Sequence, residues 1–282
     1  MRILKRKKGL QMKNKGTISY TVPYYLWLVL FVIAPVVLLV IQSFGNIYGH
    51  FTFDNYATYF SSGTYLRMTF NSVFFAFVVT AITLLISYPM AYIMSRLKNA
   101  QLWLLLVILP TWVNLLLKAY AFIGLFSKTG TVNNFLRFIG IGPHQIMFTD
   151  ASFMIVAAYI EIPFMIMPIF NSLVELDRSL INAARDLGAT PWQTLTKVII
   201  PMSMGGVKAG IQAVFIPTLS LFMITRLIGG NRVITLGTAI EEHFLVTQNW
   251  GMGSTIGVIL IIAMAATMFF TRDRKKKGGR RG

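Results

Sequence analysis

The side chains that most often carry chemistry are sparse in this sequence. It contains no cysteine, which excludes thiolate metal sites, thiol catalysis and disulfide scaffolds. Its three histidines, His50, His144 and His243, lack the spacing of metal ligands, and no nucleophile–base pattern accompanies them. The sequence also lacks a G-x-x-x-x-G-K-[ST] loop for cradling phosphates. These observations argue against an enzyme, and we expect no metal or nucleotide cofactor on this chain.

Glu161 is the carboxylate with the most unusual surroundings, because it lies within a long apolar run just before Pro163. In a bilayer an ionisable side chain at that depth costs at least about 2.5–3.5 kcal/mol, so it should face other helices or a cavity. We favour a structural ion pair with Lys118 or Arg226. The alternatives are contact with a cation that crosses the membrane and, in a secondary transporter, a proton relay.

Apolar runs long enough to cross a bilayer hold these residues in place. The chain has 282 residues, of which 55% are apolar and 12% charged, and a soluble domain carries about twice that charged fraction. Strand-type alternation is absent, so we predict helices near the ~20 residues that span the hydrocarbon core. The predicted fold class is all-α integral membrane, with about six transmembrane helices. The six runs are Val22–Phe44, Asn71–Leu97, Gln101–Phe126, Ala151–Val174, Gly205–Ile228 and Gly253–Phe270.

Basic residues set the predicted orientation. The net charge is +17, with seven Lys or Arg in Met1–Lys15 and seven more in Arg272–Gly282. Without an RNA- or DNA-binding signature, this charge predicts cytosolic termini beside anionic membrane lipid, and no nucleic-acid partner. We therefore divide the chain into a basic cytosolic tail (1–21), a transmembrane domain (22–271) and a second basic cytosolic tail (272–282).

The cytosolic loop 175–204, between the fourth and fifth spans, is polar but patterned as two short helices. Asp177 is a suitable N-cap for a helix that starts at Arg178. Gly188 can take the left-handed conformation that ends such a helix without strain on a Cβ atom.

A second helix start follows directly. Thr190 is placed as its N-cap, Pro191 at the first helical position and Gln193 at the third, which completes a capping box. Pro201 is expected to stop this helix near the membrane. The sequence thus predicts a rigid helix–turn–helix that projects into the cytosol.

This segment resembles the EAA loop of bacterial ATP-binding-cassette (ABC) importer permeases. That pattern is Glu-Ala-Ala, three residues, Gly, nine residues, and an aliphatic-x-aliphatic-Pro close. The spacing is matched throughout, and the departure is Asn182, where the family usually has Glu. The matching stretches are Asn182-Ala183-Ala184, Gly188 and Val198-Ile199-Ile200-Pro201. The resemblance implies an ATPase-coupling surface that includes Asn182, Ala183, Ala184, Asp186, Gly188 and Pro201.

The resemblance also implies partners and a location. A cytosolic ABC ATPase dimer would hold the ATP and Mg, because this chain has no phosphate loop. A second permease subunit and an extracytoplasmic substrate-binding protein would complete the importer in the bacterial cytoplasmic membrane. Transport would proceed by alternating access.

Several further stretches, among them Asn71-Ser72 and Leu109–Asn114, are similar to the spermidine/putrescine permeases of this family. Polyamines are extended cations, and their path needs carboxylates and aromatic faces. If the chain carries polyamines, Glu161 is the candidate for contact with a passing ammonium group, and the candidate aromatic neighbours are Trp112, Tyr120 and Tyr159. An importer for another small solute, such as thiamine, iron or phosphate, is the alternative.

Overall fold

The computed structural model describes residues 21–271, and this part of the chain is built from helices. Its β pairing is confined to an isolated bridge between Gly45 and Phe51. The two basic tails lie outside the described residues, residue 21 excepted. Four helices are long and apolar enough to cross a membrane, and two bent helix pairs bring the number to six if each pair is one span. The predicted all-α fold with about six spans is confirmed.

The unbroken spans correspond to the first, second, fourth and sixth predicted runs. The first and fourth match the prediction to within one residue. The second begins eight residues before the predicted Asn71, because the helix continues through polar residues that a hydropathy pattern cannot include. These spans are Thr21–Ser43, which contains η1 (Val29–Ile33) and α2 (Ala34–Ser43), then α4 (Gly63–Met94), α8 (Asp150–Val174) and α15 (Trp250–Thr271).

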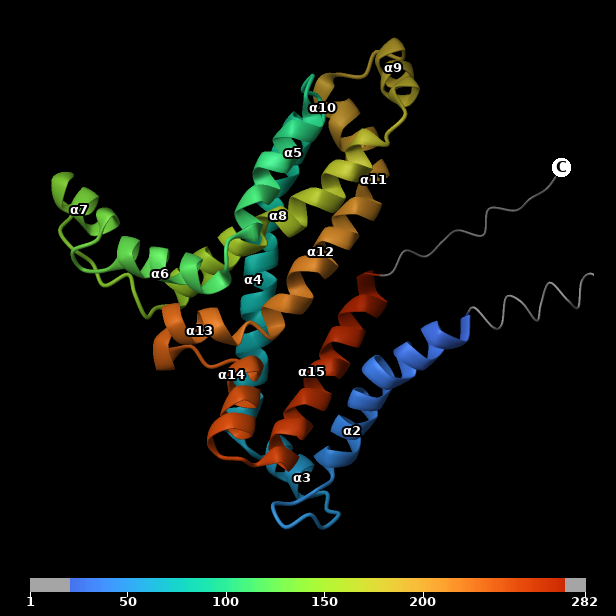
Figure 1. Ribbon diagram of the computed structural model, residues 1–282. Helices are drawn as coiled ribbons and strands as arrows, with labels where there is room; N and C mark the ends of the chain where they lie inside the picture. The colour runs from blue at the N-terminus through green and yellow to red at the C-terminus, as the bar shows by residue number, and fades with distance from the viewer. Residues whose placement is uncertain (1–20, 272–282) are drawn as a thin grey trace, which may run out of the picture.

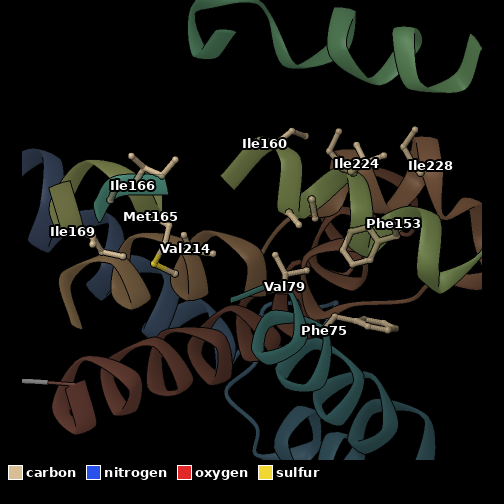
Figure 2. Close-up of a cluster of buried hydrophobic side chains, with 14 of the residues drawn as sticks. Phe75, Val79, Phe153, Ile160, Met165, Ile166, Ile169, Val214, Ile224 and Ile228 are labelled. Carbon is tan, nitrogen blue, oxygen red and sulfur yellow. The ribbon is translucent and has the colours of Figure 1, made fainter. Parts of the chain in front are cut away.

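The main core lies where α4, α8 and α12 (Met204–Leu219) pack against one another (Figure 1). Figure 2 shows Phe153 and Met165 of α8 together with Val214 of α12 in this core, and all three side chains are buried. α12 approaches α8 closely at a glycine, since a methyl group on Gly206 would lie 2.5 Å from the Pro168 carbonyl oxygen. Small residues allow this close packing in membrane bundles, where van der Waals contact is a main source of helix association.

A second core joins the last span to the N-terminal part of the molecule. α15 packs against α2, α3 (Asp54–Ser61) and α14 (Leu236–Glu241). Tyr59, Leu236 and Ile256 are buried within it. Segments from both ends of the described chain therefore meet at one side of the bundle, as Figure 1 shows for α2 and α15.

The third predicted span, Gln101–Phe126, is wrong as a single helix. The chain bends by 88° between its two halves. Pro110 lies in the 3-10 turn before the bend, and the Asn114 side chain accepts a hydrogen bond from the Leu116 amide at 2.8 Å, which caps a new helix. The elements here are α5 (Ala100–Ile108), η2 (Leu109–Trp112), α6 (Leu115–Phe126) and α7 (Thr131–Phe138).

The fifth predicted span, Gly205–Ile228, also divides differently. α12 ends at Leu219, two residues after Pro217, and α13 (Phe222–Ile228) is a separate helix. At its start, α12 follows a bend of 62° from the helical segment Pro191–Met202.

The expected stop at Pro201 is wrong by two residues. Helix α11 (Ile200–Met202) runs through this proline, and the break falls at Ser203. Pro201 sits in the first turn of α11, directly after the π turn η3 (Leu195–Ile199), and a proline is tolerated at such a position because its missing amide would have no regular partner.

Candidate functional site

The segment predicted as a helix–turn–helix has that structure. Its first helix is α9 (Arg178–Asp186), and the Asp177 side chain accepts a hydrogen bond from the Ser179 amide at 2.8 Å. That hydrogen bond holds the pKa of the Asp177 carboxyl below its ordinary value, because the bond favours the ionised form. The predicted N-cap is confirmed.

The turn after α9 is a Schellman motif. Gly188 has φ +79°, and its amide donates to the Arg185 carbonyl at 2.8 Å. The Ala189 amide donates to the Ala184 carbonyl at 3.0 Å. Only glycine adopts this left-handed backbone routinely, so the prediction for Gly188 is confirmed and the residue type follows from the geometry.

The second helix is fixed at its start in the same way. α10 (Pro191–Thr194) begins with both bonds of a capping box, from the Gln193 amide to the Thr190 hydroxyl at 3.2 Å and from the Thr190 amide to the Gln193 side chain at 2.9 Å. Two capped helices joined by a defined turn make a stiff projection. Figure 1 shows α9 and α10 together at one end of the molecule.

The predicted coupling residues are accessible on this projection. Asn182, Ala183, Asp186, Gly188 and Pro201 are exposed and Ala184 is half-buried. The neighbouring Leu187 is 89% exposed, which is the highest value among the large apolar side chains of the described residues. An apolar side chain presented on a rigid turn is suited to enter a pocket on another protein.

Glu161 lies on the inner face of the bundle. Its side chain is 4% exposed on α8, and within residues 21–271 it accepts no hydrogen bond. Lys118 of α6 is close enough for the two charges to interact, but the pair is not joined by a direct ion pair in the part of the chain that the structure describes. Arg226 forms ion pairs with Glu241 at 2.7 Å and with Glu242 at 3.6 Å instead of with Glu161.

The three candidate aromatic residues surround this position less closely than expected. Tyr159 lies two residues before Glu161 on α8, and its ring packs against Phe122 of α6 with centroids 5.0 Å apart. Trp112 and Tyr120 are largely exposed, on η2 and α6. Of the three, Tyr159 is the one whose ring packs on α6, at Phe122, and α6 and α8 also share the main core through Ala119 and Phe126.

A polar cluster away from α9, which we call the outer polar cluster, was not predicted. Arg226 of α13 binds Glu241 and Glu242, and His243 in η5 (Glu242–Val246) lies 3.0 Å from the Tyr65 hydroxyl. The cluster borders a cavity of about 530 Å³. Adjacent glutamates in a loop were visible in the sequence, but their pairing with a cation on another helix was not.

Comparison with known proteins shows the family to which the chain belongs. The family model described as "Binding-protein-dependent transport system inner membrane component" matches residues 62–272. The spermidine/putrescine transport system permease protein PotB of Haemophilus influenzae is 36% identical over 253 residues, covering 86% of this chain and 88% of that protein. The protein of the same name from Escherichia coli K12 is 36% identical over 248 residues, covering 84% and 90%.

Solved structures share the fold. The crystal structure of a bacterial ABC transporter that imports the acidic polysaccharide alginate matches with a TM-score of 0.75, 18% identity, and coverage of 98% of this chain and 100% of that one. The same type of transporter in complex with an alginate pentasaccharide-bound periplasmic protein also gives a TM-score of 0.75, at 16% identity and coverage of 92% and 93%. At this identity the similarity shows the arrangement of helices and nothing about the solute.

Proposed function

The chain belongs to the family of binding-protein-dependent transport system inner membrane components, and from this membership we propose that it is the permease subunit of an ABC importer for the polyamines spermidine and putrescine. The observation that carries the proposal is 36% identity to PotB permeases over 84–86% of this chain. The chain is a multi-pass protein of the cytoplasmic membrane. Polyamines as the transported solute explain why a carboxylate is kept inside the bundle.

The helix–turn–helix is the part that we assign to energy coupling. Its helices are capped, its turn is fixed by Gly188, and Leu187 is presented at the tip. We expect it to dock in a groove on a cytosolic ATPase dimer, which binds ATP and Mg and hydrolyses the nucleotide. Both termini then face the cytosol, in agreement with the basic tails.

A second permease subunit and a substrate-binding protein complete the proposed importer. Trp112 and Tyr120 are exposed in this chain, although they were candidates for the path. A path that forms between two permease subunits would bring such residues into its wall. The binding protein would deliver the polyamine to the outer loops, of which the one that contains α3 lies at the end of the molecule opposite α9 (Figure 1).

Glu161 is the residue that we assign to the cation path. It is buried without a hydrogen bond in the described part of the chain, and Lys118 interacts with it without forming a direct ion pair. A passing ammonium group can form the direct contact that Lys118 does not. This favours the path over the ion-pair interpretation, because a structural pair would be expected to close to hydrogen-bond distance.

The test is uptake of labelled spermidine in cells that lack the chain, with and without its re-expression. Restored uptake that fails on ATP depletion but survives collapse of the proton gradient is the expected result. Uptake that depends on the proton gradient would instead support a secondary transporter. If re-expression restores nothing while the partner subunits are present, the polyamine assignment is wrong, and labelled thiamine, iron and phosphate are the next solutes to compare.

A further inference from the structure

Three arginines share one cavity at the end of the molecule that carries the helix–turn–helix. The cavity is about 430 Å³ and is lined by Arg96, just after α4, and by Arg178 and Arg185 of α9. Arg96 stacks over the Tyr92 ring at 4.3 Å. Of the residues that the structure describes, no carboxylate lines this cavity, and none of the three guanidinium groups has an ion-pair partner.

The neutral polar groups of the cavity complete a donor-rich lining. The Asn182 side chain reaches it from α9. The Asp177 carboxylate caps the start of α9 through the Ser179 amide and is not among the residues that line the cavity. Guanidinium groups are planar forks that match the oxygen atoms of a phosphate, and several of them without a counter-charge form an anion site.

An apolar groove adjoins this cavity. It has a volume of about 600 Å³ and runs between α4 and the segment that leads into α12, with Leu85, Pro89, Trp192, Leu195 and Met204 among its walls. The Tyr88 hydroxyl on this wall is bonded to the Ser203 hydroxyl at 2.8 Å, so its ring is left as the groove surface. Tyr92 lines both the groove and the arginine cavity.

The dimensions of the combined site match one leaflet. From Leu84 of the groove to Met94, the last residue of α4, is about 15 Å at a rise of 1.5 Å per residue, with Arg96 two residues beyond, and half of the hydrocarbon core is about 15 Å. Trp192, which lines the groove, is 71% exposed, as is typical of an aromatic side chain at headgroup level.

We propose that this composite site binds one anionic phospholipid of the cytoplasmic leaflet, with the phosphate among Arg96, Arg178 and Arg185 and an acyl chain in the groove beside Tyr92. The apolar groove and the arginine cavity are separate observations, and an anionic lipid is the occupant that satisfies both. The proposal rests on the orientation given above, with α9 on the cytosolic side. It does not depend on the transported solute.

Lipid binding at this place connects the membrane to the coupling segment. A phosphate held between Arg96 and the two arginines of α9 bridges the end of a span to the helix–turn–helix. The bound lipid therefore braces α9 against α4, and movement of α9 has to carry the headgroup with it.

The test is native mass spectrometry of the purified full-length chain in detergent, titrated with dioleoyl phosphatidylglycerol or dioleoyl phosphatidylcholine. These lipids have the same acyl chains but differ in net charge. We expect one tight site with about tenfold preference for phosphatidylglycerol. Arg96→Gln should remove most of that preference, and Arg96→Lys should keep part of it. Lys98→Gln removes a nearby exposed cation outside the cavity and should leave the preference unchanged.

Further measurements distinguish a lipid headgroup from a free phosphate, and lipid from a partner subunit as the occupant of the groove. Dihexanoyl phosphatidylglycerol should bind at least about tenfold more weakly than the dioleoyl lipid, and sn-glycerol 3-phosphate should not displace it. Equal binding of both dioleoyl lipids, equal losses in Arg96→Gln and Lys98→Gln, or displacement by glycerol phosphate would each overturn the proposal. So would loss of the bound lipid when the chain is assembled with its partner subunits, because a partner would then cover the groove.

Discussion

The fourth and first spans are both apolar, yet the protein covers them in different ways. The most apolar stretch of α8 has a mean hydropathy of 2.0, and 56% of it is buried within the chain, whereas the first span has 2.7 and 0%. Each span contains two prolines, but the buried span also holds Glu161, whereas the first span has no charged residue from Val22 to Ser43. Hydropathy therefore does not report burial here. The first span packs against α15 on one side, so lipid or another subunit must cover the apolar surface that remains.

The largest expected effect comes from replacing a glycine by alanine, once where two helices are closely packed and once where the helix surface is open. A methyl group on Gly206, where α12 meets α8, would lie 2.5 Å from the Pro168 carbonyl oxygen and 2.6 Å from Cβ of Ser172. Gly206→Ala must push these helices apart, and we expect a loss of about 3 kcal/mol in stability. Gly124→Ala on α6 meets no atom within 4 Å and should be neutral or slightly stabilising.

Thermal unfolding followed by size-exclusion chromatography checks this pair. Gly210→Ala is an intermediate case, because its methyl group would meet the flexible Met165 Sδ atom at 2.6 Å. The expected order of unfolding temperatures is Gly124→Ala highest, then Gly210→Ala, then Gly206→Ala. If Gly206→Ala unfolds at the same temperature as Gly124→Ala, the close packing of α8 and α12 at Gly206 does not contribute to stability.

The next effect extends the comparison to an uncovered surface that we assign to a partner. Gly188→Val places a β-branched residue at φ +79°, which costs about 1–2 kcal/mol or more in local strain, although no neighbouring atom lies within 4 Å of the new Cβ. The fold of the bundle should survive while the turn changes shape. Substrate-stimulated ATP hydrolysis in the reconstituted importer should fall several-fold.

Gly188→Asn is the matched control, because asparagine tolerates the left-handed region better than valine. It should retain most of the stimulation. Full stimulation in Gly188→Val would refute the role of this turn in coupling.

A further effect tests why the buried span holds a charge at all. Glu161→Gln keeps the shape of the side chain and removes its charge, so polyamine uptake should fall about tenfold at low substrate concentration, while assembly stays intact. Glu175→Gln, on an exposed carboxylate just after α8, should leave uptake unchanged. Unaltered uptake kinetics in Glu161→Gln would remove this residue from the path and return it to a structural role beside Lys118.

The comparison also explains what could be predicted from the sequence. The caps at Asp177 and Thr190 and the turn at Gly188 are local, so residue types at fixed offsets were enough to place them. The ends of α8 followed from a long apolar run with a break on each side. Local patterns therefore gave the elements that depend on neighbouring residues alone.

The features that could not be predicted depend on tertiary geometry. The bend after Pro110 turns by 88°, and a proline predicts a break without its angle. Arg226 was a candidate partner for Glu161, but it pairs with Glu241. The sequence offered Arg226 several carboxylates, and only the tertiary structure shows which of them lies close to it. The arginine cavity likewise unites residues after α4 with residues of α9, which are distant in the sequence.

The smallest effect concerns the outer polar cluster, where charges have partners and one histidine is partly buried. Burial lowers the pKa of His243 from its ordinary value, and the nearby Glu242 partly opposes this shift. The ring lies 3.0 Å from the Tyr65 hydroxyl and 3.2 Å from the Thr247 hydroxyl, so neutral imidazole suits the folded state.

The sign follows from proton binding. Between the ordinary pKa of histidine and the lower folded value, the unfolded chain binds more protons, so stability falls as the pH falls through this window. Thermal unfolding at pH 7.5 and pH 5.5 should therefore give a lower temperature at the acidic pH, and His243→Gln should reduce that difference. Asp177, whose pKa is also lowered, titrates below this range and does not interfere. An unchanged difference in His243→Gln would mean that His243 has the same pKa in the folded and unfolded chain, so the cluster does not favour a neutral ring.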